Sequence, residues 1–486
     1  MNEIKAESPE NSAAEAREST SGKQVSQNIQ HPIIPVPGDY IPSATQLRPE
    51  GTRVFNKRVW YWGLWDWASA AFNAVVTTFV FTVYLTNDEL FGNDANFWLG
   101  YALTVAGLII AIVAPALGQS VDRSGKSASV LTFTTLLTVV VTAGLFFVTP
   151  GQNGLLLGLF LLAAGNILFE TGSVIYNAMI SDISSPSNVG KVSGFGWGLG
   201  YVGGIVLLLI LFIGFISPEV GWFGVTSANG LNVRVAMLFA AAWLLLFSLP
   251  LLLTARNKPR RTEIVVDGLI GAYKQLFRSV AKLWREDRSV VWFLISSAIY
   301  RDGLAGVFTF GAVLASAAFG FTSSEVIIFG VAANVVAGIA TIAFGVLDDK
   351  LGSRAVIIFS VAMMVLFGMI VFFFHNGMGT LNGKQVYWIF GLALCVFVGP
   401  TQSASRTYLA RIAPAGEEGE LFGLYATTGR AVSFLAPFMY ANAIVIAANL
   451  TGQQKDEVAY AGILGIALVL LVGLLTFIPV KAQAKQ

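Results

Sequence analysis

Six ionisable side chains lie inside long apolar stretches of this sequence: Asp66, Glu170, Arg301, Asp302, Arg406 and Arg430. A charge at the centre of a membrane-inserted helix costs about 2.5–3.5 kcal/mol, so such a residue usually faces a polar cavity or an oppositely charged partner. Carboxylates in that setting can take up and release protons, and arginines can bind anions through charge-assisted hydrogen bonds. The chemistry predicted is therefore reversible binding of protons and ions rather than covalent catalysis.

The surrounding sequence is too apolar for a soluble protein. Hydrophobic residues make up 55% of the chain and charged residues 12%, about half of the roughly 25% that is usual in globular domains. Apolar stretches long enough to cross a bilayer core of about 30 Å recur along the chain, and in lipid they must be helical because their backbone groups need internal partners. We expect twelve spans, near 59–85, 97–117, 128–148, 154–181, 191–216, 233–254, 290–319, 324–347, 355–374, 385–411, 420–449 and 457–479.

The predicted fold class is therefore an all-α integral membrane protein with two six-helix halves, 53–254 and 289–480. Residues 1–52 are polar and predict a disordered tail. Residues 255–288 form a polar linker, and 481–486 form a short second tail.

Lysines and arginines indicate the orientation, because they are enriched in cytoplasmic loops. They gather in every second turn and in the linker, whereas the opposite loops are nearly bare. Both termini should therefore be cytoplasmic, in a plasma (inner) membrane. The formal net charge of +2 gives no reason to expect a nucleic-acid partner.

One short pattern occurs once in each half: Gly, three residues, Asp, a cation, any residue, Gly. Its repetition between apolar stretches indicates two similar halves. The glycines permit a tight turn, and each Asp can meet a cation or a helix end at the inner rim. The residues of the pattern are Gly118, Asp122, Arg123 and Gly125 in the first half and Gly345, Asp349 and Gly352 in the second.

Most of the buried acids lie in the first half of the sequence, and the buried arginines lie in the second. Glu170 and Arg430 each lie about eleven residues from the cytoplasmic end of their span, or about 16 Å deep at 1.5 Å per residue. Glu170 is the first candidate proton carrier, because burial raises the pKa of a carboxyl group; Asp302 and Asp66 are further candidates. The candidates for substrate binding are Arg430, Arg301, Arg406, Gln402, Asn177 and Asn73. The competing interpretation is that these charges pair with one another and only lock the halves together.

Three further patterns have structural interpretations. Trp60, Trp62, Trp65 and Trp67 predict an interfacial belt, with an aromatic stacking site as the alternative. Glycines repeated along 194–204 favour close packing of the fifth span. In the linker, apolar residues on one face (Leu269, Tyr273, Leu276, Phe277, Val280, Leu283, Trp284) and cations on another (Lys274, Arg278, Lys282, Arg285) predict an amphipathic helix on the inner lipid surface or on a partner.

The repeated turn resembles the loop signature of major facilitator transporters, which joins the second and third helices of each six-helix half. In such transporters these contacts hold the outward-facing state shut on the cytoplasmic side, so the resemblance implies that the residues of the pattern gate conformational change. More specific segments resemble the vacuole-effluxer-like permeases, typified by the fungal autophagy-related amino-acid exporter. They include Trp65-Asp66-Trp67-Ala68, Asp302-Gly303, Gln402-Ser403-Ala404-Ser405-Arg406 and Gly429-Arg430-Ala431. This resemblance implies an alternating-access carrier, with amino-acid export as one function. The family usually has Asn where this chain has Arg301, and often Lys where it has Arg430.

We therefore expect a secondary transporter for an amino acid or a similar small zwitterion or anion. No ATP-binding P-loop is present, so a gradient must drive transport, most plausibly of protons. The expected partners are the solute and membrane lipids, and the expected oligomeric state is a monomer. An efflux pump for hydrophobic drugs and a non-transporting sensor or scaffold are the alternatives. With a single Cys395 and two histidines, His31 and His375, neither a metal site nor a cofactor is expected, and no enzyme motif is visible.

Overall fold

The computed structural model describes residues 53–92, 94–258, 287–414, 416–455 and 457–481, with seven positions between 274 and 285. The predicted first tail (1–52) and, except for Lys481, the second tail (481–486) lie outside the described residues. In the linker, Lys274, Arg278, Val280, Leu283, Trp284 and Arg285 are helical. The rest of the predicted amphipathic faces (Leu269, Tyr273, Leu276, Phe277 and Lys282) lies outside the described residues.

The described residues contain 12 helices long and apolar enough to cross a membrane, as the sequence predicts. Several spans contain more than one helical segment. The first six spans comprise α1 (Lys57–Ala70), α2 (Phe81–Leu85), α4 (Ala95–Ser124), α5 (Ser127–Gly144), α6 (Gln152–Ala178), α7 (Ile180–Ile183), α8 (Val189–Leu211) and α9 (Leu231–Thr254). The last six comprise α11 (Arg288–Ala317), α12 (Ser323–Leu351), α13 (Ser353–Phe373), α14 (Gly383–Val386), α15 (Leu392–Val396), α16 (Val398–Ile412), α17 (Glu418–Val432), α18 (Leu435–Thr451) and α19 (Gly462–Phe477).

Short elements occupy the connections. Helix α3 (Asp88–Phe91) lies between the first two spans, and strands β1 (Gly377–Met378) and β2 (Leu381–Asn382) form an antiparallel hairpin before α14. Three spans contain π-helical segments, at Ala71–Phe79, Phe212–Ile216 and Tyr387–Gly391. Such segments are rare and often occur at functional sites.

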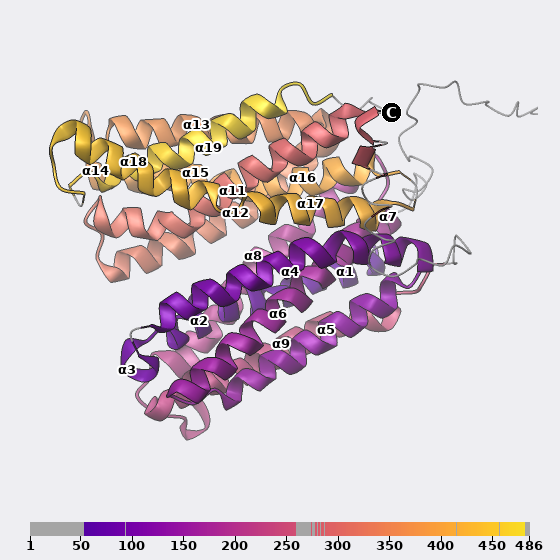
Figure 1. Ribbon diagram of the computed structural model, residues 1–486, viewed down its shortest axis with the longest axis horizontal. Helices are drawn as coiled ribbons and strands as arrows, with labels where there is room; N and C mark the ends of the chain where they lie inside the picture. Colours follow the sequence, from indigo (N-terminus) through magenta and orange to yellow (C-terminus); the bar gives the residue numbers. More distant parts are fainter. Residues whose placement is uncertain are drawn as a thin grey trace, which may run out of the picture. The chain divides into compact units, whose positions relative to one another are not determined.

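The helices form two groups that follow the order of the sequence (Figure 1). In the first, α1 packs against α8 and α9, and α6 packs against α4 and α5; in the second, α19 packs against α11, α13 and α18. The groups meet chiefly where α8 packs on α12 and where α4 packs on α17. Helices α4 and α12 carry the repeated Gly–Asp pattern, and α17 and α8 face it.

Most of the repeated Gly–Asp pattern is helical, whereas the sequence analysis placed the whole pattern in a turn. Helix α4 continues to Ser124 and α12 to Leu351, so only Gly125 and Gly352, with φ of 69° and 88°, lie in the turns. The second span was expected to end near residue 117, where polar residues begin. It continues because Gln119 packs against the other half and is only 2% exposed.

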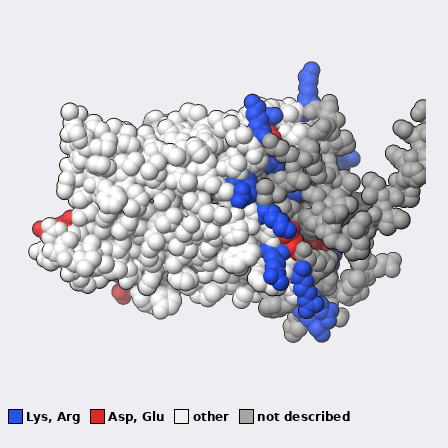
Figure 2. All heavy atoms as spheres, turned by 90° about the horizontal axis from the view of Figure 1, so that it is seen from above, with Lys and Arg blue, Asp and Glu red and all other residues white. Residues whose placement is uncertain are grey.

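Lysine and arginine side chains gather at one end of the helical region, and a few acidic residues mark the opposite end (Figure 2). We call the first of these the basic end. It contains the turns after α4 and α12, with Lys126 and Lys350 exposed. Lys481 also belongs to it, because its backbone carbonyl accepts a hydrogen bond from Tyr408 at 3.0 Å, near the end of α16.

The glycines of α8 pack against two different partners. Gly196 and Gly203 face Trp62 and Trp67 of α1, whereas Gly194 faces the backbone of Thr341 in α12, at separations that leave no space for a side chain. The glycine pattern is therefore a packing feature, as the sequence favours, and it allows α8 to contact both halves of the molecule closely.

Candidate functional site

Glu170 and Arg430 form an ion pair between the two halves, near the middle of their spans. Glu170 lies on α6, and Arg430 lies in the last turn of α17, where the negative end of the helix dipole favours a cation. The two side chains are 31% and 33% exposed. Both side chains are therefore only partly buried.

Arg301 of α11 lies beside α17 as well. Its guanidinium group stacks on the ring of Tyr425, 3.8 Å from the centroid, and its Nη1 donates a hydrogen bond to the Tyr425 carbonyl at 3.0 Å. Within the described part of the chain, no carboxylate lies within 4.0 Å of Arg301. The middle of the molecule thus has one arginine whose charge is not balanced by a neighbouring acid.

Asp302 points elsewhere although it follows Arg301 directly. The eleventh span is interrupted between α17 and α18, and the Asp302 carboxylate accepts a hydrogen bond from the backbone N–H of Ala436 in the first turn of α18. A carboxylate at a helix N-terminus satisfies an otherwise unpaired donor and meets the positive end of the dipole. Asp302 therefore stabilises the broken helix and is not grouped with Glu170 and Arg430.

Arg406 of α16 joins four helices nearer the basic end. Its Nη1 lies 3.3 Å from the Asp66 carboxylate of α1 and donates to the Asn177 side chain of α6 at 3.1 Å. Its Nε and Nη2 donate to the hydroxyl and carbonyl of Ser193 of α8, at 3.0 and 2.7 Å. Arg406 is 3% exposed. In this conformation it locks the halves and is not open to a solute.

Buried tryptophans support this layer, which corrects the predicted interfacial belt. Trp62 and Trp65 are 0% and 3% exposed, and both stack on Tyr176. The indole N–H of Trp62 donates to the Tyr176 carbonyl, and the Arg406 guanidinium lies over the Trp62 ring, 4.7 Å from its centroid. Of the four tryptophans, Trp60 is the most exposed, at 47%. The belt interpretation is wrong for Trp62 and Trp65, because a cation and a tyrosine from other helices cover them.

Asp122 and Asp349 each bind the first turn of a helix in the opposite half. Asp122 accepts the backbone N–H groups of Gly419 and Glu420 of α17, at 3.0 and 2.8 Å. Asp349 accepts those of Gly190 and Lys191 of α8, at 2.7 and 3.0 Å.

The first glycines of the pattern allow these contacts. A side chain at Gly118 would overlap the backbone of Gly419, and one at Gly345 would overlap that of Gly190. The repeated pattern therefore packs two pairs of helices at backbone distance, at the basic end.

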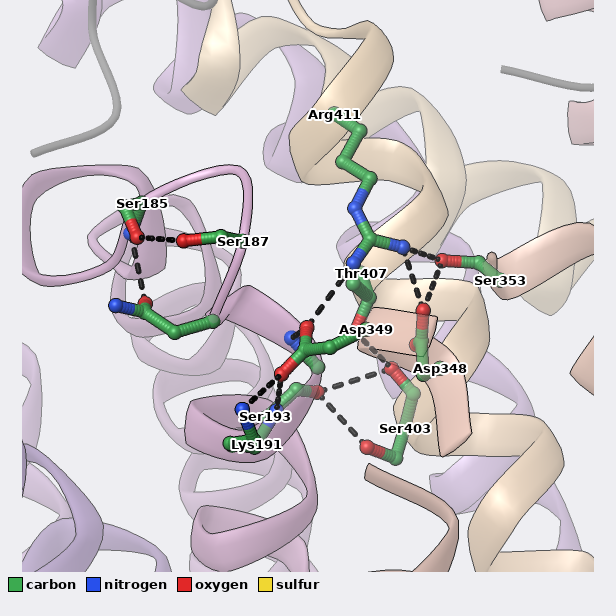
Figure 3. A network of polar contacts seen from close by, with 12 residues as sticks. Ser185, Ser187, Lys191, Ser193, Asp348, Asp349, Ser353, Ser403, Thr407 and Arg411 are labelled. Atoms are coloured by element: carbon green, nitrogen blue, oxygen red, sulfur yellow. Dashed lines mark hydrogen bonds and ion pairs between the residues drawn. The ribbon is translucent and has the colours of Figure 1, made fainter. Parts of the chain in front are cut away.

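A second network surrounds Asp349 (Figure 3). Arg411 of α16 pairs with Asp348 and, at 3.2 Å, with Asp349, and it also donates to the Ser353 hydroxyl at 2.6 Å. Lys191 lies 3.8 Å from the same Asp349 carboxylate. The sequence analysis did not identify Asp348 and Ser353 as functional residues. The acid doublet 348–349 was the available signal, because two buried acids side by side require cations.

Lys258, in the segment after α9, ties that segment to the first half. Its ammonium group lies 2.7 Å from the Asp182 carboxylate, and its backbone N–H donates to the Gly125 carbonyl at 2.8 Å. Burial lowers the pKa of Lys258, but the nearby carboxylates of Asp182, Glu418 and Asp122 outweigh this effect, so its pKa is raised above the usual 10.5.

The remaining candidates are not assembled with these groups. Gln402 is half-buried one turn before Arg406, and Arg123 is half-buried one turn after Gln119. Asn73 is exposed in the π-helical segment, where its carbonyl accepts hydrogen bonds from Thr77 and Thr78 at 2.7 Å. Among the described residues, no group of three or more His, Cys, Asp or Glu side chains is placed to hold a metal ion.

Comparison with known proteins decides the family. The sequence model of the vacuole effluxer Atg22-like family matches residues 93–485. The chain belongs to this family. The chain is 27% identical over 434 residues to an uncharacterized MFS-type transporter, YxiO, of Bacillus subtilis, and this match covers 87% of this chain and 95% of the relative. It is 23% identical over 307 residues to the autophagy-related protein 22 of Yarrowia lipolytica, but spans only 50% of that protein.

Solved structures show the fold of this Atg22-like chain. The proton:xylose symporter XylE, bound to 6-bromo-6-deoxy-D-glucose, superposes with a TM-score of 0.64 over 88% of this chain and 96% of that one, at 14% identity. A bacterial homologue of the iron transporter ferroportin, in an outward-facing state, gives 0.60 over 88% and 99%, also at 14% identity. The chain is therefore an MFS-type transporter with the major facilitator fold, and not an enzyme.

Proposed function

We propose that this Atg22-like transporter carries a small carboxylated solute, of the size and charge of an amino acid, by alternating access. The Glu170–Arg430 pair carries the proposal. It joins opposite halves at mid-depth, and each side chain is about one third exposed. A solute carboxylate can replace Glu170 at Arg430, and a solute ammonium group can replace Arg430 at Glu170, so one zwitterion satisfies both charges when the pair opens.

The charge distribution supports an orientation. Lysines and arginines gather at the basic end (Figure 2), which by the positive-inside tendency faces the cytoplasm of a plasma membrane. Both ends of the described chain would then be cytoplasmic. The contacts of Asp122, Asp349 and Arg406 would close the cytoplasmic side, and the conformation would be outward-facing.

Proton coupling is proposed at Glu170. Protonation of this carboxyl would remove the charge that holds Arg430 and would free the guanidinium group for the solute carboxylate. The structural similarity to a protein described as a proton:xylose symporter supports proton coupling in this fold. Asp66 and Asp302 are less suited, because Arg406 and the N-terminus of α18 hold their carboxylates in this conformation.

The first experiment identifies the solute. A ligand that binds only the folded state raises its stability, so thermal unfolding of the purified protein is measured with amino acids, sugars, nucleosides and lipophilic cations at two pH values. Amino acids should stabilise the wild type and not Arg430→Ala. Stabilisation by lipophilic cations alone would replace this proposal with export of hydrophobic compounds.

Transport then tests the coupling. In proteoliposomes, Glu170→Gln should abolish proton-driven uptake while solute exchange partly remains, because exchange needs no net proton movement. Glu89→Gln, an exposed residue at the opposite end from the basic residues, is the control and should change neither activity. Proton-driven uptake that survives in Glu170→Gln would contradict the assignment.

A further inference from the structure

A buried amide and a buried carboxyl group meet between the halves at the basic end. Gln119 of α4 and Glu420 of α17 are 2% and 8% exposed. The amide Nε2 of Gln119 donates a hydrogen bond to Oε2 of Glu420 at 3.0 Å. The other oxygen of each side chain, Oε1 of Gln119 and Oε1 of Glu420, is buried without a hydrogen-bond partner.

The two unpaired oxygens have one common explanation. Both are acceptors as long as Glu420 is ionised, and buried polar atoms in folded proteins are nearly always paired. A proton on Oε1 of Glu420 makes this atom a donor, and the unpaired Oε1 of Gln119 is an acceptor on the side chain to which Glu420 is already bound. A single proton therefore satisfies both atoms and completes an acid–amide pair with two hydrogen bonds.

The charges around Glu420 are mixed, but none of the described cations nearby pairs with its carboxyl group. Two acids lie close by in sequence or contact: Asp122, which accepts the backbone N–H of Glu420 at 2.8 Å, and Glu418, which is 3% exposed. Arg123 follows Gln119 by one turn of α4. The other charges on packed elements have partners of their own: Lys258 with Asp182, Arg301 with Tyr425, Glu170 with Arg430, and Arg411 with Asp348 and Asp349. Within the described residues, no cation lies within 4.0 Å of the Glu420 carboxyl group.

We propose that Glu420 is a proton-binding site of the basic-end gate, occupied while α4 and α17 are packed together and emptied when they separate. In the closed conformation the proton resides on Oε1 of Glu420 and is donated to Oε1 of Gln119. When the helices part, water solvates the carboxyl group and the proton passes to that water. A pocket at the basic end is lined by Asp122, Glu418 and Gly419, which are neighbours of Glu420.

The second interface between the halves, formed by α8 and α12, shows that the fold does not require this pair. The backbone N–H groups of Gly419 and Glu420 donate to Asp122, and those of Gly190 and Lys191 donate to Asp349 in the same way. Lys191 therefore occupies the position that is equivalent to Glu420. The residue equivalent to Gln119 is Val346, which is 37% exposed. There, Lys191 and Arg411 balance Asp348 and Asp349 by charge (Figure 3). One interface is thus closed by ion pairs, and the other has an acid without a cation.

A proton fits this site better than a metal ion, because no group of three or more metal-ligating side chains is placed to hold one in the described part of the chain. The site depends neither on the identity of the solute nor on Glu170. Because the closed conformation binds one proton more than the open one, a lower pH must favour closure, by up to about tenfold in the closed-to-open ratio per pH unit.

Infrared spectroscopy tests protonation directly. The purified full-length wild type, without solute, should show the carbonyl stretch of a protonated carboxylic acid that disappears as the pH is raised from about 5.5 to about 8.5. Other acids at the basic end can contribute bands of their own, so the two pH difference spectra are subtracted, and that of Glu420→Gln should lack one band that the wild type shows. Glu417→Gln, an exposed acid three residues earlier, should keep it. A wild-type difference spectrum identical to that of Glu420→Gln would overturn the proposal.

A distance measurement tests the link to the gate. With Cys395→Ala as background, spin labels are attached at Lys126→Cys and Lys350→Cys, two exposed positions of opposite halves at the basic end. In the wild type, the closed-to-open ratio should fall at least about tenfold as the pH is raised over these three units. This change is smaller than the largest change that one linked proton allows over the same range. Glu420→Gln, whose amide can donate to Gln119 at every pH, should remain closed throughout. Gln119→Leu removes the acceptor and should favour the open form even at low pH. A pH response that is absent from the wild type, or that persists in Glu420→Gln, would overturn the proposal.

Discussion

Asp122 and Asp349 occupy equivalent places in the two halves, and each accepts two backbone N–H groups from the first turn of a helix across the interface. Neither α8 nor α17 has a side-chain cap from the residue that precedes it. The opposite half thus supplies the cap, and it can do so only while the basic end is closed. If the basic end is the gate that we propose, helix capping and gate closure are one interaction.

Asp122→Ala and Asp349→Ala should therefore each favour the open basic end. Loss of a capping side chain costs about 1 kcal/mol, which corresponds to about fivefold in the closed-to-open ratio. Asp349→Ala should have the larger effect, because it also removes a partner of Arg411. The spin labels at positions 126 and 350 measure the ratio at constant pH.

Asp94→Ala is the matched control for this pair. Asp94 precedes α4 at the opposite end but makes no capping hydrogen bond through its side chain. Its replacement should leave the distance distribution unchanged. If it opens the basic end as much as Asp122→Ala does, capping across the interface is not the cause.

Arg406→Ala should open the same end and lower the thermal stability of the protein. The variant leaves Asp66, which is only 14% exposed, without its cation, and breaking a buried ion pair in this way costs about 3–5 kcal/mol. Asp66→Ala in addition should recover part of the loss, because the uncompensated charge is then gone. Unfolding midpoints of the two single variants and the double variant measure this coupling. Additive losses would show that the ion pair does not act as a unit.

The twelve spans were predictable because apolar length reports directly on the cost of placing backbone and side chains in lipid. The cation distribution likewise locates the basic end. The helix boundaries at the repeated pattern were not predictable in the same way. Hydropathy ends the second span before Gln119, whereas the structure continues it to Ser124, because the other half covers these polar residues.

The candidate site was predictable as a set of residues but not as a set of partners. Single buried charges such as Glu170 and Arg430 stand out in apolar sequence, whereas their pairing depends on which helices of the two halves face each other. For Trp62 and Glu420, the sequence does not indicate that the residue is buried. Each has a type and position typical of the membrane interface, and only contacts from distant helices reveal that it is buried.

The Lys258–Asp182 pair makes a prediction about pH. A raised lysine pKa means that the folded protein holds this proton more tightly, so its stabilisation is fully present below about pH 10.5 and is lost as the pH rises through the higher folded value. Lys258→Met should therefore lower the thermal unfolding midpoint by the same amount at every pH between about 6 and 9. The loss should be at most about 1 kcal/mol, because both side chains are more than one third exposed. A loss that grows with pH inside this range would show that another group is responsible.

Arg301 should determine the charge preference for the solute. Glu170 and Arg430 pair with each other, and the Asp302 carboxylate faces the first turn of α18, so among the described residues Arg301 is left without an acid within 4.0 Å. Loss of a hydrogen bond to a charged group costs about 1.5–3 kcal/mol. Arg301→Gln should therefore raise the KM of a carboxylated substrate about 10- to 100-fold and leave that of its neutral amide analogue nearly unchanged. Arg301→Lys is the control that keeps the charge but loses the planar stacking on Tyr425, and its KM should lie between those of wild type and Arg301→Gln. Equal losses for the charged and the neutral solute would show that Arg301 only supports α17, to which its Nη1 is already bound.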